Sequence, residues 1–344
     1  MSSDMTPSED AVAAESADES TMTSPTPRPK TTGLHVGDPA PGVAKVDPII
    51  VADNVRRSFG GVHAVDVDHL EIPRGAITAL IGPNGAGKTT LFNLLTGFDK
   101  PNEGTWSFDG HSLSGVAAYK VSRMGLVRTF QLTKALGLLT VMENMKLGAK
   151  NQRGEKFWSS LIPPLWRSQD DELEDRAMEL LKRFKLDTKA DDFAASLSGG
   201  QRKLLEMARS LMTEPTLVML DEPMAGVNPA LTQSLLDHIL NLKDEGMTVL
   251  FVEHDMHMVR HIADWVVVMA EGKIVAEGDP HEVMRDPAVI DAYLGAHQDV
   301  DLGHVTGRIP TVGGDAPSSM TADEIVAEAE AEEEAVRKSQ EKHK

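Results

Sequence analysis

One octapeptide constrains the fold of this chain more than any other feature, because it matches G-x-x-x-x-G-K-S/T between an apolar run and a helical pattern. The octapeptide and the residue after it are Gly82, Pro83, Asn84, Gly85, Ala86, Gly87, Lys88, Thr89 and Thr90. The glycines let backbone N–H groups turn inward, and the following helix adds the positive end of its dipole. The pattern predicts a phosphate-binding loop, in which Lys88 reaches the β- and γ-phosphates and Thr89 gives a hydroxyl to Mg²⁺. An ordinary glycine turn is the weaker interpretation, because a strand pattern precedes the loop and a helical pattern follows it.

Short apolar runs and helical patterns alternate around this loop, from residue 49 to residue 297. The candidate strands are residues 76–81, 216–220, 248–252 and 265–269, and residues 88–95 have helical spacing. Strands that alternate with helices predict an α/β sheet with parallel strands at its centre. Residues 264–278 differ, because two strand patterns meet at Glu271-Gly272 and predict a hairpin.

The segment from about residue 133 to residue 212 interrupts this alternation with helical patterns. We expect it to form a mostly helical subdomain inserted into the α/β core. Within it, residues 169–186 carry one apolar face at helical spacing, formed by Leu173, Ala177, Leu180, Leu181 and Phe184. Farther along, Asp279 is expected to cap the last helix, with Pro280 in its first turn and Glu282 three residues after the cap.

The two ends of the chain differ from its middle in composition. Residues 1–48 and 298–344 are acidic and contain few large apolar residues. Such segments cannot bury enough surface to offset the entropy lost on ordering. Both are therefore predicted to be largely disordered, on either side of a folded domain of residues 49–297, although residues 322–344 could form a solvated helix.

The composition also excludes several kinds of site. The chain has no cysteine, which excludes disulfides, zinc–thiolate sites and cysteine nucleophiles. Its formal net charge of −19 argues against nucleic acid as the main partner, because a phosphate backbone is bound by a basic surface. No apolar run approaches the roughly 18 to 20 residues that a membrane span needs, so a role at a membrane would require a partner.

A second candidate site feature is the apolar run 217–220, which ends in the acids Asp221 and Glu222. Acids at the end of a buried strand are costly unless they meet a cation or transfer a proton. Asp221 is placed to hold Mg²⁺, and Glu222 is the natural general base for an attacking water. An acidic pair after a strand is common, so its weight comes from the glycine-rich loop in the same chain.

A family resemblance begins at Leu197-Ser198-Gly199-Gly200-Gln201, which precedes the helical run 202–212. Taken alone, Ser198 suits an ordinary helix cap. The motif nevertheless resembles the signature of ABC ATPases, and the resemblance extends over residues 49–297. It assigns four more positions, namely Phe59 under the adenine, Gln131 of the Q-loop, residues 225–229 of the D-loop and His254 as the switch histidine. Phe59, Gln131 and His254 would each be structural if found singly, but their order and spacing favour function.

The resemblance implies the P-loop ABC ATPase fold, with an antiparallel β part, and a mechanism that uses ATP and Mg²⁺. Two subunits, identical or different, would meet head to tail with ATP between the glycine-rich loop of one and the signature of the other. The signature residues Ser198, Gly199, Gly200 and Gln201 would face the ATP of the partner subunit. Mg²⁺ would be held by Thr89, Gln131 and Asp221, and the catalytic residues would be Glu222, His254 and Gln131. The closing and opening of the pair would drive two transmembrane permease subunits.

Five motifs resemble the ATPases of branched-chain amino acid importers, a subfamily that includes urea and short-chain amide importers. They are residues 128–131, 140–144, 225–229, 253–256 and 292–295. Asn228 departs from the general pattern, since many ABC ATPases carry aspartate there, and communication across the dimer could be altered. By this resemblance the chain would lie at the cytoplasmic face of the inner or plasma membrane through its permeases, which receive solute from a solute-binding protein.

Two other function classes stay open from the sequence. An exporter ATPase, or one that extracts lipid or lipopolysaccharide, would have the same architecture and shares the Tyr-Leu-Gly ending. A soluble ABC protein acting on ribosomes or DNA usually has two ATPase units or a long coiled coil. The single glycine-rich loop, the single signature and the lack of a heptad insert argue against that class.

Overall fold

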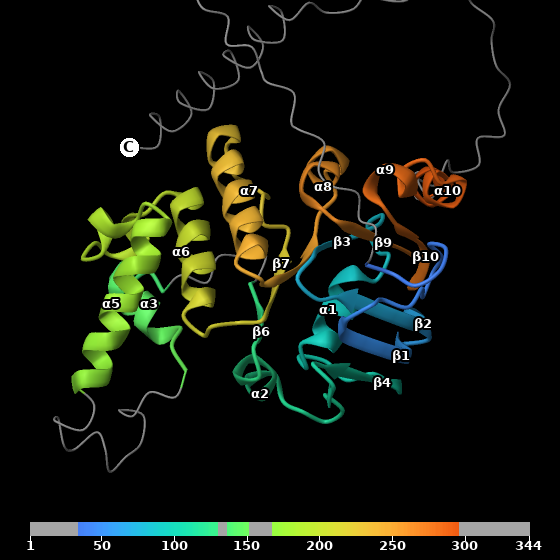
Figure 1. The fold of residues 1–344 in the computed structure, drawn as a ribbon, viewed down its shortest axis with the longest axis horizontal. Coiled ribbons are helices and arrows are strands. Elements are labelled where there is room, and N and C mark those ends of the chain that lie inside the picture. Colours follow the sequence, from blue (N-terminus) through green and yellow to red (C-terminus); the bar gives the residue numbers. More distant parts are fainter. Residues whose placement is uncertain (1–33, 130–135, 151–166, 296–344) are drawn as a thin grey trace, which may run out of the picture. The chain divides into compact units, whose positions relative to one another are not determined.

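The computed structural model describes residues 34–129, 136–150 and 167–295. Its larger sheet has six strands in the order β10-β9-β3-β8-β7-β6 (Figure 1). Their bounds are β3 Ile77–Ile81, β6 Leu126–Arg128, β7 Leu217–Asp221, β8 Thr248–Val252, β9 Trp265–Ala270 and β10 Lys273–Gly278. Strands β3, β6, β7, β8 and β9 pair in parallel, which confirms the predicted α/β sheet. The last pair, β9 and β10, is antiparallel and turns at Glu271-Gly272, where the hairpin was predicted.

A second, antiparallel sheet has the order β2-β1-β4-β5. Its strands are β1 Pro48–Phe59, β2 Val62–Pro73, β4 Glu103–Phe108 and β5 His111–Ser112. Along β1 and β2 the buried positions are apolar and most of the partly exposed positions between them are polar, as one half-buried face requires. The buried face packs on helix α1, Lys88–Leu95, and so places β1 and β2 beside the glycine-rich loop.

Helix α1 lies between the two sheets and belongs to a core shared by both. Its residues Leu91, Phe92, Leu94 and Leu95 are buried in that core. Successive residues of β3 face opposite sides of the large sheet, because strand side chains alternate. Leu80 therefore joins the core around α1, whereas its neighbours in β3 join a second core on the other face.

The second core contains residues of the opposite face of the large sheet and of five helices. The helices are α3 Val141–Leu147, α5 Arg167–Arg183, α6 Gly199–Leu211, α7 Pro229–Asp244 and α8 Met256–Ile262, and of these α3 and α5 pack on α6. The short turns η3 Asp187–Lys189 and η4 Ala194–Ser196 connect α5 to α6, and α2 Ala118–Arg123 precedes β6. Of the apolar face expected on α5, Ala177, Leu181 and Phe184 are buried, and Leu173 and Leu180 pack against them as partly buried residues. Ser198 begins α6, so helix packing fixes the position of the predicted signature.

Residues 34–47 correct the prediction that the first 48 residues form one disordered segment. Lys45 forms an ion pair with Glu277 at 2.9 Å, and both side chains are fully buried. Glu277 also accepts hydrogen bonds from the backbone N–H of Val43 at 3.0 Å and from Nε1 of Trp265 at 2.9 Å. Each charge is thus paired and hydrogen-bonded, as a buried ion pair requires. The prediction missed this segment because its partners on β9 and β10 lie more than 200 residues away in sequence.

The predicted last helix is also corrected. Asp279 does cap a helix, and its side chain accepts a hydrogen bond from the backbone N–H of His281. That helix, α9 Pro280–Val283, has only four residues, and α10 Pro287–Gly295 follows it. Among the described residues, none of the helices combines the length and the apolar character that crossing a membrane requires.

Candidate nucleotide-binding site

The glycine-rich loop joins the end of β3 to the beginning of α1, and its glycines approach other backbone closely. A Cβ atom on Gly82 would lie 2.1 Å from the carbonyl oxygen of Met269, and one on Gly87 would lie 2.2 Å from that of Ala64. Gly87 is the N-cap of α1 at φ 100°, and no side chain caps the helix. The backbone N–H groups of Lys88, Thr89 and Thr90 in the first turn therefore lack intrahelical acceptors. A bare helix N-terminus after a tightly packed glycine loop is suited to binding an anion.

Lys88 folds back over this loop. Its Nζ donates hydrogen bonds to the carbonyl oxygens of Gly82 at 2.7 Å and Pro83 at 2.9 Å. Burial lowers the pKa of Lys88, while the nearby charges of Glu222 and Asp221 raise it. The ammonium group is thus held at the loop by neutral acceptors, close enough to both acids to be affected by their charge.

Asp221, at the end of β7, is buried in an ion pair that the sequence did not predict. Its Oδ2 accepts a hydrogen bond from Nη2 of Arg128 at 2.6 Å, and the two side chains are 6% and 5% exposed. Nη1 of Arg128 donates a second hydrogen bond to Oδ1 of Asn93 on α1 at 2.6 Å. Arg128 therefore links the acid of β7 to the helix that follows the glycine loop. In the sequence, the only indication that Arg128 belongs to the site was its position in the family motif of residues 128–131.

Glu222 and His254 follow the ends of two neighbouring parallel strands, β7 and β8. Glu222 has a left-handed backbone with φ 46°, and its N–H donates to the carbonyl oxygen of Val252 at 3.1 Å. The side chain of His254 is exposed, and its Nδ1 lies 3.9 Å from Oε2 of Glu253. Because β3 is the other neighbour of β8, the glycine loop, Asp221, Glu222 and His254 all lie at the carboxyl edge of one sheet. Ligands of open parallel sheets bind at this edge.

Glu253, which precedes His254, is a buried carboxylate that the sequence indicated only as part of a family motif and not as a site residue. It is 3% exposed and accepts hydrogen bonds from the backbone N–H groups of Met224 at 3.1 Å and His254 at 3.3 Å. Burial raises the pKa of Glu253, and the charge of Glu222 adds to that rise. Glu253 itself follows β8, and it thus connects the loop after β7 to His254.

The signature residues lie on a different, exposed surface at the N-termini of α6 and α7. Ser198 caps α6 in a reciprocal pair: its Oγ accepts from the N–H of Gln201 at 3.2 Å, and Oε1 of Gln201 accepts from the N–H of Ser198 at 2.9 Å. A Cβ on Gly200 would lie 1.8 Å from Cδ2 of Leu231, whereas Gly199 faces open space. Asn228 caps α7 by accepting a hydrogen bond from the N–H of Leu231 at 2.9 Å. The signature therefore packs on the helix that the D-loop residue Asn228 caps.

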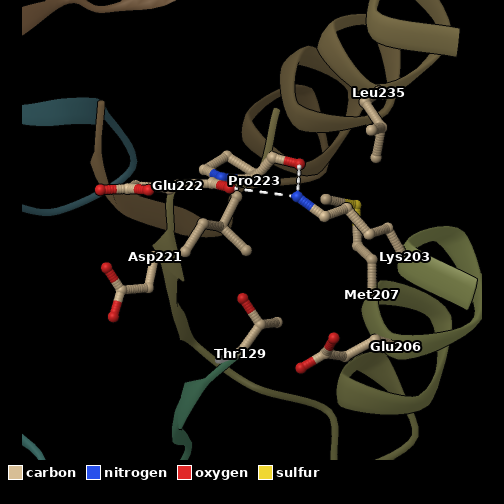
Figure 2. A pocket seen from close by; sticks show the side chains of 9 residues that line it. Thr129, Lys203, Glu206, Met207, Asp221, Glu222, Pro223 and Leu235 are labelled. Atoms are coloured by element: carbon tan, nitrogen blue, oxygen red, sulfur yellow. Dashed lines mark hydrogen bonds between the residues drawn. The ribbon is translucent and has the colours of Figure 1, made fainter. Parts of the chain in front are cut away.

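Of the two remaining predicted site residues, only Phe59 belongs to the part of the chain that the structure describes. Phe59 ends β1 with 48% of its surface exposed, and the Arg57 guanidinium lies 4.4 Å from the centre of its ring. Gln131 lies outside the described residues. A narrow cavity beside the acidic strand end is lined by Thr129, Lys203, Glu206 and other residues of β7 and α6 (Figure 2).

The comparisons with known families and proteins agree with this geometry. Residues 65–225 match the family described as ABC transporter, and residues 273–299 match the family described as branched-chain amino acid ATP-binding cassette transporter. A probable branched-chain amino acid transport ATP-binding protein LivG of Archaeoglobus fulgidus is 38% identical over 254 residues, which cover 74% of this chain and 98% of that protein. The high-affinity LivG protein of Escherichia coli K12 is 40% identical over 250 residues, covering 72% of this chain and 98% of its own.

Solved structures give the same result. A crystal structure of an ABC transporter ATP-binding cassette in its ADP conformation has a TM-score of 0.63 and 37% identity, and covers 72% of this chain and 99% of that one. A nucleotide-free cassette has a TM-score of 0.62 and 36% identity, with 71% and 98% coverage. Sheet, loop and helices together build the nucleotide-binding fold of these cassettes, and this chain belongs to the family of ABC transporter ATP-binding proteins, as an ATPase subunit.

Proposed function

We propose that this subunit powers the import of branched-chain amino acids or related small polar solutes. The observation that carries this proposal is the match of residues 273–299 to the branched-chain amino acid cassette family, together with relatives of that name over nearly their whole length. Those residues include β10, α9 and α10, which lie outside the general ABC transporter match. The substrate itself would be bound by other subunits, so the chemistry of this chain is that of ATP.

In the proposed site the phosphates lie on the glycine loop and the first turn of α1. Lys88 leaves the carbonyl oxygens of Gly82 and Pro83 and donates instead to β- and γ-phosphate oxygens. The aromatic ring of Phe59 stacks on the adenine. The nucleotide-binding set is completed by Gly82, Pro83, Asn84, Gly85, Ala86, Gly87, Thr89 and Thr90.

The proposed set of donors fits Mg²⁺, which prefers oxygen ligands and commonly takes one or two carboxylates beside phosphate oxygens. Asp221 supplies a carboxylate at the carboxyl edge of the sheet, and Arg128 ties it to α1, whose first turn carries the hydroxyl of Thr89. Gln131 is the third proposed ligand. When bound, Mg²⁺ would neutralise charge that develops on the transferred phosphoryl group.

Glu222 is the proposed general base, which takes a proton from the attacking water at its carboxylate. His254, on the neighbouring strand end, orients that water and contacts the γ-phosphate, with Gln131 beside it. A second ATPase subunit binds head to tail and presents its signature to this ATP. The residues that it presents are equivalent to Ser198, Gly199, Gly200 and Gln201 of this chain. Asn228, which caps the helix on which Gly200 of the same subunit packs, would line the contact between subunits.

The proposal places two permease subunits and, indirectly, a solute-binding protein around this ATPase pair at the cytoplasmic face of the membrane. To test it, tagged Glu222→Gln chain is purified from its own membranes in the presence of ATP, and copurified proteins are identified by mass spectrometry. Tagged Lys88→Ala chain serves as the matched control, because it should not form the ATP-bound pair. Purified solute-binding protein is then titrated with leucine, isoleucine and valine.

We expect two permeases, a second ATPase subunit and a solute-binding protein that binds these amino acids. Recovery of lipid-export partners, or of permeases without a solute-binding protein, would contradict the import proposal and leave the ATP chemistry intact. Recovery of ribosomes would contradict a role in transport altogether.

A further inference from the structure

Lys203, on the helix that begins with the signature, reaches across to the loop that follows β7. Its Nζ donates to the carbonyl oxygens of Glu222 at 3.3 Å and Pro223 at 3.1 Å, and makes a third, shorter hydrogen bond to that of Ala225. An ammonium group has three donors, and here each has a backbone acceptor. Figure 2 shows Lys203 approaching the loop from α6, while the carboxylates of Asp221 and Glu222 point to the opposite side.

The loop held in this way carries the proposed general base in a conformation that needs support. The left-handed backbone of Glu222, with φ 46°, costs a non-glycine residue conformational energy and persists only when surrounding contacts fix it. Glu253 holds the same loop at a second point, by accepting the N–H of Met224. The ammonium group of Lys203 on three carbonyl oxygens and the carboxylate of Glu253 on one N–H group therefore fix residues 222–225.

The helix at the other end of this contact is the one that bears the signature. Ser198 caps α6, and Gly200 packs so closely on Leu231 that a Cβ would collide with its side chain. Two contacts, Lys203 to the loop and Gly200 to α7, thus tie the first turns of α6 to both ends of the segment 222–231. Burial lowers the pKa of Lys203, while the charges of Glu253, Glu206 and Glu222 raise it. A displacement of α6 would act on the backbone of Glu222 directly.

We propose that Lys203 is a positioning residue that ties the backbone of Glu222, and through it the position of its carboxylate, to the signature helix of the same subunit. The inference rests on the proposed function, in which the signature faces the ATP of the partner subunit and Glu222 serves the ATP of its own. Lys203 then transmits nucleotide contact at one site to the base of the other. The tether couples the two ATP sites without touching either nucleotide.

The test compares Lys203→Met with Lys203→Arg in the membrane-derived complex, purified through the tagged full-length chain. Methionine keeps the length of the side chain but loses the cation, and arginine keeps a cation that can donate to several carbonyl oxygens. We expect Lys203→Met to lower kcat roughly tenfold, because a small displacement of a catalytic group is enough for such a loss. The KM for ATP and the Kd for a fluorescent ATP analogue should stay unchanged, Lys203→Arg should restore most of kcat, and the Hill coefficient for ATP should fall toward one in Lys203→Met.

Lys182→Met, an exposed site at the end of α5, is the matched control and should behave as the wild type. An unchanged kcat in Lys203→Met would overturn the inference, as would a loss of nucleotide affinity equal to the loss of kcat, or Lys203→Arg as impaired as Lys203→Met. If Lys203→Met does not fold, Lys203→Gln, which keeps donors without the charge, is judged by the same criteria. A wild-type complex that does not hydrolyse ATP would instead refute the proposed function, so the two failures are distinguishable.

Discussion

Two lysines hold two loops of this protein, and the difference between them separates binding from positioning. Lys88 and Lys203 are both half-buried, burial lowers the pKa of each, and each donates to backbone carbonyl oxygens of a loop that follows a buried strand. Lys88 bonds to its own loop, five and six residues back along the chain. Lys203 arrives from another helix and bonds to three residues that lie 19 to 22 positions farther along the chain.

The contacts of Lys88 are local and can be exchanged, since phosphate oxygens accept the same hydrogen bonds with greater strength. The contacts of Lys203 join two elements of the fold, and the proposed site puts no phosphate on that side of the loop. The glycine loop should therefore determine whether nucleotide is bound, and the loop after β7 should determine how fast it is hydrolysed. That division would be wrong if substitutions in both loops changed nucleotide affinity and hydrolysis rate in the same way.

The largest effect is expected at the loop after β7. Glu222→Gln should keep ATP binding but slow hydrolysis by roughly 10²-fold or more, because an amide cannot accept the proton of the attacking water. Steady-state ATPase rates and the Kd of a fluorescent ATP analogue measure the two quantities separately. Near-normal turnover would remove Glu222 from its role as base, and Glu172→Gln, on the exposed side of α5, is the control.

The next effect is expected at the glycine loop and should have the opposite character. Lys88→Ala should weaken ATP binding by between about 10-fold and 100-fold, since it removes charge-assisted hydrogen bonds to phosphate. The Kd is measured for ATP and for adenosine, which lacks the phosphates. A loss of affinity for ATP but not for adenosine is expected, and an equal loss for both would show that the variant damages the fold instead.

The same contrast explains which parts of the molecule could be predicted from the sequence. The glycine loop, the cap of α6 by Ser198 and the hairpin at Glu271-Gly272 depend on residues close together in the chain, and each was predicted. The Arg128–Asp221 pair and the Lys203 tether depend on contacts between separate elements, and no local pattern indicates them. The Lys45–Glu277 pair is the extreme case, because it joins residues 232 positions apart and extends the fold into a segment of disorder-like composition.

A third prediction compares a glycine of each region. Gly87→Ala should lower the free energy of unfolding by about 2 kcal/mol, because alanine is disfavoured at φ 100° and its Cβ would meet a backbone oxygen. Gly200→Ala should lower it by about 1 kcal/mol, since its backbone is helical and the obstacle is a Leu231 methyl group. Urea unfolding at constant pH measures both. Adding Leu231→Ala should restore the stability lost in Gly200→Ala, because the obstacle there is a side chain. No side-chain substitution at Ala64 should restore the stability lost in Gly87→Ala, because the obstacle there is a backbone oxygen. Equal restoration at both glycines would contradict this difference.

The smallest effect concerns Glu253, which holds the loop after β7 together with Lys203 by accepting the N–H of Met224. Burial raises its pKa above the ordinary value of 4.5, so the folded chain binds this proton more tightly than the unfolded chain does. The stability that Glu253 contributes is therefore present at low pH and is lost as the pH rises from 4.5 through the raised pKa, by at most about 1.4 kcal/mol per unit of that rise.

Glutamine does not ionise, so Glu253→Gln should remove this dependence while keeping one acceptor for the N–H of Met224. The free energy of unfolding is measured from pH 5 to pH 8 for both proteins, with the exposed Glu172→Gln as the control. The wild type should lose stability relative to Glu253→Gln as the pH rises. The difference in free energy of unfolding between the two proteins could instead stay constant with pH or change in the opposite direction. Either result would mean that the surrounding groups fully compensate the negative charge of Glu253, and that Lys203 and Glu253 stabilise the loop after β7 as an ion pair rather than independently.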